Sequence, residues 1–120
     1  MTKHSININV HLDNQKLPEH IDWNASGSGE AEPQQAKAFM AAFWDPKERT
    51  ALRMDLWTKK MMVDEMNDFF FQTLMTMADS YTRATNNEDL SAELKTFARE
   101  FKRKADEKLV AEEKKTEETK

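Results

Sequence analysis

Three histidines and a few carboxylates are the residues whose types could support chemistry. His11 and His20 fall on the polar side of two alternating stretches typical of paired strands, so their spacing allows a two-histidine metal site. Asp22 is the nearest further ligand, whereas His4 lies outside this pattern. The simpler interpretation, which we favour, is two solvated histidines beside a turn. We therefore expect no metal and no cofactor, and a metal-dependent enzyme built on these residues is only a remote alternative.

Further acidic and basic groups lie on the predicted helices. Asp64, Glu65 and Asp68 could in principle support acid–base catalysis, but acidic residues in a first helical turn ordinarily complement the helix dipole. The basic residues at 99–104 are interspersed with acidic ones, which is typical of a solvated helical face with ion pairs four residues apart. We expect no catalytic residue and predict that the protein is not an enzyme.

Composition excludes several classes of protein. The 120 residues contain no cysteine, which rules out disulfide scaffolds, thiolate zinc sites and cysteine nucleophiles. The first ten residues, MTKHSININV, lack the apolar core of a signal peptide, and no segment approaches the ~20 apolar residues of a membrane span. A net charge of −4 argues against general nucleic-acid binding. We expect a cytoplasmic protein without nucleic acid or membrane insertion.

The elements that would position these residues begin with a β-hairpin. Apolar and polar residues alternate over 5–12 and again over 20–25, and a turn cluster at 13–16 lies between them. Ile21, Trp23 and Ala25 are expected on the core side of the second strand. Residues 26–30 contain both glycines of the chain and predict a flexible loop.

The stretch from Ala51 to Tyr81 organises the chain. Residues 51–57 alternate as a strand, and from Val63 the apolar residues recur three and four positions apart, which predicts an amphipathic helix. The helical stripe consists of Met66, Phe70, Leu74, Met77 and Tyr81, widened by further apolar residues. A helix this apolar is expected to be covered on most of its circumference.

Residues 36–45 have two interpretations. Pro33 and the spacing of Ala36, Phe39 and Phe43 suit a helix, but the same residues also alternate as a strand. The turn-like segment 45–50 would then join that strand to 51–57 as a second hairpin. We choose the strand, because propensity is a weak guide against tertiary context, and the helix stays open as the alternative.

The C-terminal part predicts a second helix. Asparagines at 86 and 87 suit a helix end followed by a new cap, and the second helix is expected over 88–112. Residues 113–120 have nothing to bury and are expected to be disordered. The predicted fold is α+β: an antiparallel β-sheet of about four strands in two hairpins, then two antiparallel helices packed on one face. Residues 1–112 are expected to form a single domain.

An aromatic cluster is the candidate functional surface. If residues 36–45 form a strand, Phe39, Phe43 and Trp57 are expected to share one face of the sheet, opposite Met40, Met54 and Leu56. Helices on the other face would leave these aromatics uncovered, and an exposed aromatic patch marks a protein interface. We predict these three residues as protein-interaction residues.

The segment LRMDLWTKKMMVDEMNDFFFQTLMTMAD, with the upstream IDW and AKAF…WD, resembles GldC, a family associated with gliding motility in Bacteroidetes. The similarity covers most of the chain, and LRMDLWTK followed by VDEM and a phenylalanine-rich helix is its most specific part. The family often has proline before VDEM, where this chain has Met62. The resemblance implies a small cytoplasmic accessory protein of gliding, a process linked to type IX secretion, with no assigned enzymatic activity.

Two functions follow from this pattern and this resemblance. The first is a non-enzymatic adaptor of gliding motility that binds a protein partner, or itself as a homo-oligomer, through Phe39, Phe43 and Trp57. The second is a chaperone that holds secretion clients, since the order of sheet and helices is similar to that of the export chaperone SecB. Fold-level analogy alone says little about function, so the adaptor is the preferred hypothesis.

Overall fold

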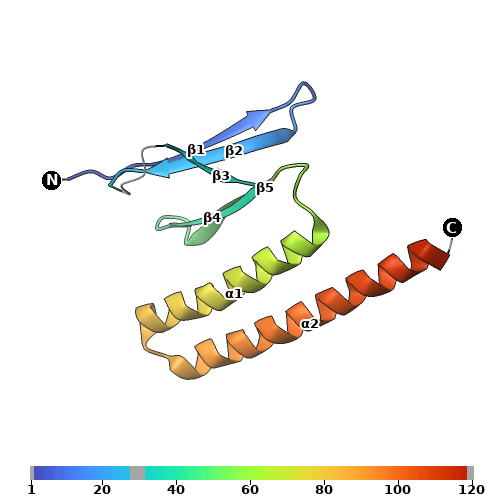
Figure 1. Cartoon of the computed structure of the whole chain (residues 1–120). Helices are drawn as coiled ribbons and strands as arrows, with labels where there is room; N and C mark the ends of the chain where they lie inside the picture. Colours follow the sequence, from blue (N-terminus) through green and yellow to red (C-terminus); the bar gives the residue numbers. More distant parts are fainter. Residues whose placement is uncertain (1, 28–31, 119–120) are drawn as a thin grey trace. The chain divides into compact units, whose positions relative to one another are not determined.

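The computed structural model describes residues 2–27 and 32–118 of an α+β chain (Figure 1). The elements are β1 (Ile6–Leu12), β2 (Pro18–Ala25), β3 (Gln34–Ala36), β4 (Ala38–Asp45), β5 (Thr50–Trp57), α1 (Val63–Thr85) and α2 (Glu88–Glu118). The predicted order of antiparallel strands followed by two helices is confirmed. The strands divide between a three-stranded sheet, β1-β2-β3, and a two-stranded sheet, β4-β5, rather than forming one sheet of about four.

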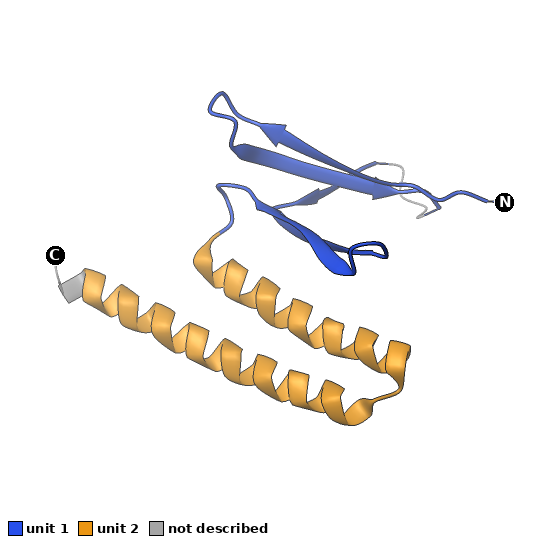
Figure 2. Cartoon of the chain, turned by 180° about the vertical axis from the view of Figure 1, so that it is seen from behind, with its two compact units in different colours: residues 1–61 blue, residues 62–120 orange. Residues whose placement is uncertain are grey.

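The chain falls into two compact units, residues 1–61 and residues 62–120 (Figure 2). The first unit contains all the strands, and the second consists of the helix pair. Each unit is described by itself below. The single domain predicted over residues 1–112, and the packing of the helices on the sheet, stay predictions.

The first hairpin has the predicted faces. β1 pairs antiparallel with β2, so that Ile8 lies opposite Trp23 and Val10 opposite Ile21 on the apolar side. The side chain of Ile21 is 1% exposed and is the largest fully buried side chain among the described residues. At the turn, the Oδ1 atom of Asp13 accepts hydrogen bonds from the backbone N–H groups of Gln15 (2.8 Å) and Leu17 (3.0 Å). The period of two therefore predicts this hairpin correctly.

Residues 34–45 run through both sheets. β3 pairs with β2, and after the single residue Lys37 the chain continues as β4 and pairs with β5. The backbone N–H of Thr58 donates a hydrogen bond to the carbonyl oxygen of Lys37 (2.8 Å), so the joint is also bonded to the end of β5. Strands that pass from one sheet to the next by a local bend are a known way to build sheet corners. The strand interpretation of 36–45 is confirmed, and the short strand β3 is a further element that the pattern did not predict.

The loop predicted over 26–30 is described only at its start. The backbone N–H of Ser26 donates to the carbonyl oxygen of Ser5 (2.9 Å), and Gly27 has a φ of 81°, a left-handed conformation that glycine adopts without strain. Residues 28–30 of the predicted loop lie outside the described residues.

Polar residues mark both ends of α1 and the start of α2, as predicted. The Oε1 atom of Glu65 accepts a hydrogen bond from the backbone N–H of Met62 (3.1 Å) at the start of α1. Asn86 adopts a left-handed conformation (φ 60°) at its end, and the Oδ1 atom of Asn87 accepts the N–H of Leu90 (3.2 Å) to cap α2. The short link makes α1 and α2 antiparallel neighbours (Figure 1).

Small residues fill the contact between the helices. Ala78 of α1 and Ala98 of α2 are fully buried, and Ser91 is 5% exposed. The Ser91 hydroxyl donates to the carbonyl oxygen of Ala78 (2.9 Å) and accepts from the hydroxyl of Thr82 (2.6 Å). The large side chains of Phe70, Met77 and Tyr81 on α1 are partly exposed, although the ring of Phe70 lies 6.4 Å from that of Phe101 on α2. The expected covering of α1 on most of its circumference stays a prediction.

The predicted disordered tail is wrong for residues 113–118, because α2 continues to Glu118. Glutamate and lysine have good helix propensity, and extending an existing helix needs no new nucleation. Lack of buried side chains is therefore insufficient to end this helix. Residues 119–120 lie outside the described residues. Neither of the described helices is long and apolar enough to span a membrane.

Candidate interaction surface on the second hairpin

The β4–β5 register separates the predicted aromatic cluster. Phe39 lies opposite Leu56, whereas Ala38 lies opposite Trp57. Directly opposed residues of an antiparallel pair project to the same face, so Phe39 and Trp57 project to opposite faces. The prediction that Phe39, Phe43 and Trp57 share a face is wrong. Phe39 and Phe43 share their face with Met54, a residue that had been assigned to the other side.

The connection between the strands is the physical reason. Asp45 pairs with Thr50, which leaves the four residues 46–49 as the loop. A loop with an even number of residues places the odd-numbered residues of β4 opposite the even-numbered residues of β5. The alternation within each strand does not by itself show which residues of the two strands lie opposite each other. The loop is held by Asp45, whose carbonyl oxygen accepts the N–H of Arg49 (2.8 Å) and whose Oδ1 accepts the N–H of Lys47 (3.1 Å). Arg49 takes a φ of 54° to close it.

Both faces of this hairpin carry large exposed apolar side chains. We name the first the Phe face; it consists of Phe39, Ala41, Phe43, Leu52, Met54 and Leu56. Toward the loop, Phe43 is 66% exposed, Leu52 56% and Met54 55%. The second, the Trp face, carries Trp44 (62% exposed) and Trp57 (56% exposed). A two-stranded ribbon with large exposed apolar side chains on both sides lacks the wholly polar face of an ordinary surface hairpin, so both faces are candidate contact surfaces.

An ion pair lies between the two tryptophans along the Trp face. The guanidinium of Arg53 makes two hydrogen bonds with the carboxylate of Asp55: Nη2 to Oδ1 (2.8 Å) and Nε to Oδ2 (3.1 Å). Bidentate pairing fixes the geometry of both groups and neutralises their charge. The Trp face therefore presents two aromatic surfaces separated by a locally neutral polar patch.

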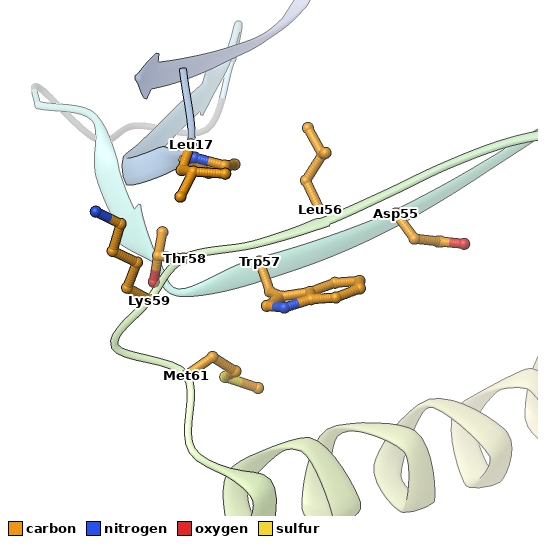
Figure 3. Close-up of a pocket in the computed structure, with 8 residues that line it drawn as sticks. Leu17, Asp55, Leu56, Trp57, Thr58, Lys59 and Met61 are labelled. Carbon is orange, nitrogen blue, oxygen red and sulfur yellow. The ribbon is translucent and has the colours of Figure 1, made fainter. Parts of the chain in front are cut away.

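A hollow of about 440 Å³ opens beside the end of β5, and Leu56 and Trp57 project to opposite sides of the strand there (Figure 3). Its lining within the first unit comprises Leu17, Pro18, Asp55, Leu56, Trp57, Thr58, Lys59 and Met61. Thr58 is 3% exposed, and its Oγ1 has no hydrogen-bond partner among the described residues. A buried hydroxyl without a partner is costly, so Thr58 is a locally unfavourable feature of the structure beside this hollow.

The predicted histidine cluster does come together on the first hairpin. His11 lies directly opposite His20, and Asp22 lies on the same polar face. The Oδ2 atom of Asp22 is 2.9 Å from Nε2 of His11 and 3.6 Å from Nε2 of His20. Hydrogen bonds from Asn9 and then from His11 lower the pKa of the Asp22 carboxyl. The sequence pattern thus placed these three residues together correctly.

The carboxylates and basic residues of the helices have structural partners. Asp68 of α1 pairs with Lys102 of α2 (Oδ1 to Nζ, 3.1 Å). Glu65 accepts the backbone N–H of Met62 at the start of α1, as described above. Arg103 pairs with Glu100 and with Glu107 along α2, as predicted for a solvated face. Neutralisation by neighbouring carboxylates leaves this basic group poorly suited to a phosphate.

Sequence reasoning missed Trp44, Leu52 and Met54 as parts of the exposed surface. Alternation predicted Met54 on the side opposite the aromatic cluster, and neither Leu52 nor Trp44 was singled out. The signal that could have found them is the even length of the 46–49 loop, since it fixes which residues of the two strands lie opposite each other.

Comparison with known proteins gives one match. The model of the family described as gliding motility-associated protein GldC-like matches residues 18–107, which include β2 to β5, all of α1 and most of α2. No curated protein and no solved structure matches the chain. A family match over this much of the chain, on the same segments that carry the sequence resemblance, identifies the protein as a member of the gliding motility-associated GldC-like family.

Proposed function

We propose that the protein is a non-enzymatic, cytoplasmic adaptor of gliding motility that binds a protein partner through the β4–β5 hairpin. The observation that carries this proposal is the exposure of large apolar side chains on both faces of one hairpin. Tryptophan, phenylalanine and methionine are the residue types enriched in protein interfaces. Membership of a gliding motility family supports the process, and the exposed apolar side chains of the hairpin support it as the contact surface.

Strand pairing offers a second means of binding. Within the part of the chain that the structure describes, β5 pairs only with β4, so the outer edge of Thr50–Trp57 is open to another strand. Added strands bind through backbone hydrogen bonds, while side chains on both faces select the partner. The Phe face and the Trp face would then contact alternate side chains of the same bound segment.

The test is complementation of a strain that lacks the protein, combined with partner recovery from the native cell. Phe43→Ala and Trp57→Ala are expected to abolish gliding and to lose one or two stoichiometric partners. Because both side chains are more than half exposed, their removal should leave the melting temperature nearly unchanged. Phe97→Ala on α2 is the matched control, since Phe97 is 58% exposed but lies outside the hairpin.

Other outcomes identify other functions. Full gliding and full partner recovery in both hairpin variants would contradict the proposal. A large loss of stability in Trp57→Ala would show that Trp57 belongs to a core. Recovery of many unfolded proteins, together with suppressed aggregation of an unfolded test protein, would instead support the client-holding chaperone. Recovery of the protein alone would support self-association as the function of this surface.

A further inference from the structure

The cross-strand trio of His11, His20 and Asp22 has the donor types and the placement of a transition-metal site. One ligand atom from each of the three residues lies within 4.8 Å of the other two. The imidazole ring centroids are 5.1 Å apart, and both Nε2 atoms face the same carboxylate oxygen of Asp22. Two imidazole nitrogens with one carboxylate oxygen form a common set for zinc and similar divalent ions.

We propose that His11 Nε2, His20 Nε2 and Asp22 Oδ2 bind one divalent transition metal ion. The geometry and the experiment below are worked out for Zn²⁺. At metal–ligand distances of about 2.0–2.1 Å, ligand atoms of a tetrahedral site lie about 3.4 Å apart. The observed separations thus need only rotation of exposed side chains. The fourth position remains for water or for a donor from a bound partner. Sequence alone favoured solvated histidines; the convergence of both rings on one oxygen changes that interpretation.

Asn9 supports this assignment. It lies opposite Asp22 on β1, and its Nδ2 donates a hydrogen bond to Oδ1 of Asp22 (2.9 Å). This bond fixes the carboxylate so that the other oxygen, Oδ2, faces the imidazoles. Hydrogen bonds that orient a ligating carboxylate are a regular feature of metal sites. The Asp22 side chain is only 14% exposed, which limits its alternative conformations.

The site is open to solvent, so a metal ion can enter it, and it bridges two strands that a bound ion would hold together. The side chains of His11 and His20 are 56% and 48% exposed, so no rearrangement of the backbone is needed for access. A bound ion would join β1 to β2 near the turn at Asp13. The site is therefore proposed as a clamp on the first hairpin and not as a catalytic centre.

The experiment is titration of the full-length chain, with any histidine tag removed, against Zn²⁺ by isothermal calorimetry, beside thermal melting with and without Zn²⁺. The expected result is saturable binding of one ion per chain and a rise in the melting temperature. His11→Asn and His20→Asn should lose at least about 100-fold in affinity, and Asn9→Ala about tenfold. Mg²⁺ should not bind, because it prefers oxygen ligands.

His4→Asn is the matched control, because His4 lies outside the trio. Circular dichroism spectra that match the wild type establish that each variant is folded. Equal affinity in the His4, His11 and His20 variants would overturn the assignment, as would the absence of saturable binding at micromolar Zn²⁺. Retention of the thermal shift in His11→Asn would also overturn it, since the clamp requires both histidines.

Discussion

Replacing Ile21 by alanine tests where the interior of the first unit lies. Ile21 is 1% exposed and lies between Val10 of β1 and Ala36 of β3 on the apolar face. Full burial of such a side chain stabilises by about 1.5–3 kcal/mol, and the cavity left by alanine raises the total loss to about 2–5 kcal/mol. Ile6 lies on the same face opposite Ala25, but it is 74% exposed. Because about a quarter of the Ile6 side chain is buried, Ile6→Ala should lose only about 0.5 kcal/mol of unfolding free energy.

The assay is urea unfolding of the full-length chain, followed by circular dichroism and by tryptophan fluorescence, to which Trp23 on the same face as Ile21 contributes. With a typical urea dependence of about 1–3 kcal/mol per molar, Ile21→Ala should lower the midpoint by roughly 1–2 M. The midpoint of Ile6→Ala should change by less than about 0.5 M.

Either of two results would refute the reasoning. A small loss in Ile21→Ala would show that this side chain is not the centre of a packed interior. Equal losses in Ile21→Ala and Ile6→Ala would show that Ile6 is covered in solution by something beyond its own sheet. If the loss of unfolding free energy in Ile6→Ala then depended on protein concentration, the group that covers Ile6 would be a second copy of the chain.

Two further predictions concern polar groups. Ser91→Ala should cost about 1–2 kcal/mol of unfolding free energy, because it removes the buried bond to Ala78 and the partner of Thr82. Thr96→Ala, which removes an exposed hydroxyl on the same helix, should cost less than about 0.5 kcal/mol, and equal losses would contradict the buried network. A hydrogen bond from Lys59, followed by one from the Leu17 N–H, lowers the pKa of Asp13. The ionised carboxylate therefore stabilises the fold above the unfolded pKa of about 3.9, and this contribution is lost as the pH falls through the lower folded value. Asp13→Asn should be destabilised at pH 7, and its difference from the wild type in urea titrations should shrink below about pH 4; a constant difference would count against the pairing.

Local periodicity predicted the first hairpin well, because each of its faces is consistently apolar or polar. The same alternation placed His11 and His20 opposite each other and Asp22 beside them, since a short turn leaves little freedom in the pairing. The candidate site on the second hairpin was harder. Both of its faces contain apolar residues, so the pattern could not select a register, and the loop at 46–49 decided it.

The remaining errors have similar physical origins. β3 has only three residues, too few for an alternating pattern to be recognised, so the sequence does not mark it. The end of α2 was placed too early, because absence of apolar residues says nothing about helix propensity once a helix has formed. The helical conformation of residues 113–118 is explained by helix propensity, whereas that of the earlier part of α2 is also stabilised by packing against α1.

The joint at Lys37 has a consequence for changes of chain length. Side chains alternate along β4 with a period of two, and the positions of Ala36 on β3 and of Thr58 beside Lys37 fix where β4 begins. Deleting one residue here would turn the β4–β5 hairpin over relative to β3, while the loop at 46–49 would keep Phe43 opposite Leu52 on the Phe face. Inserting two residues would keep the faces and only displace the hairpin along its length. Changes of an even number of residues at this joint should therefore keep the direction of the Phe face relative to β3, whereas odd changes should present the Trp face in its place.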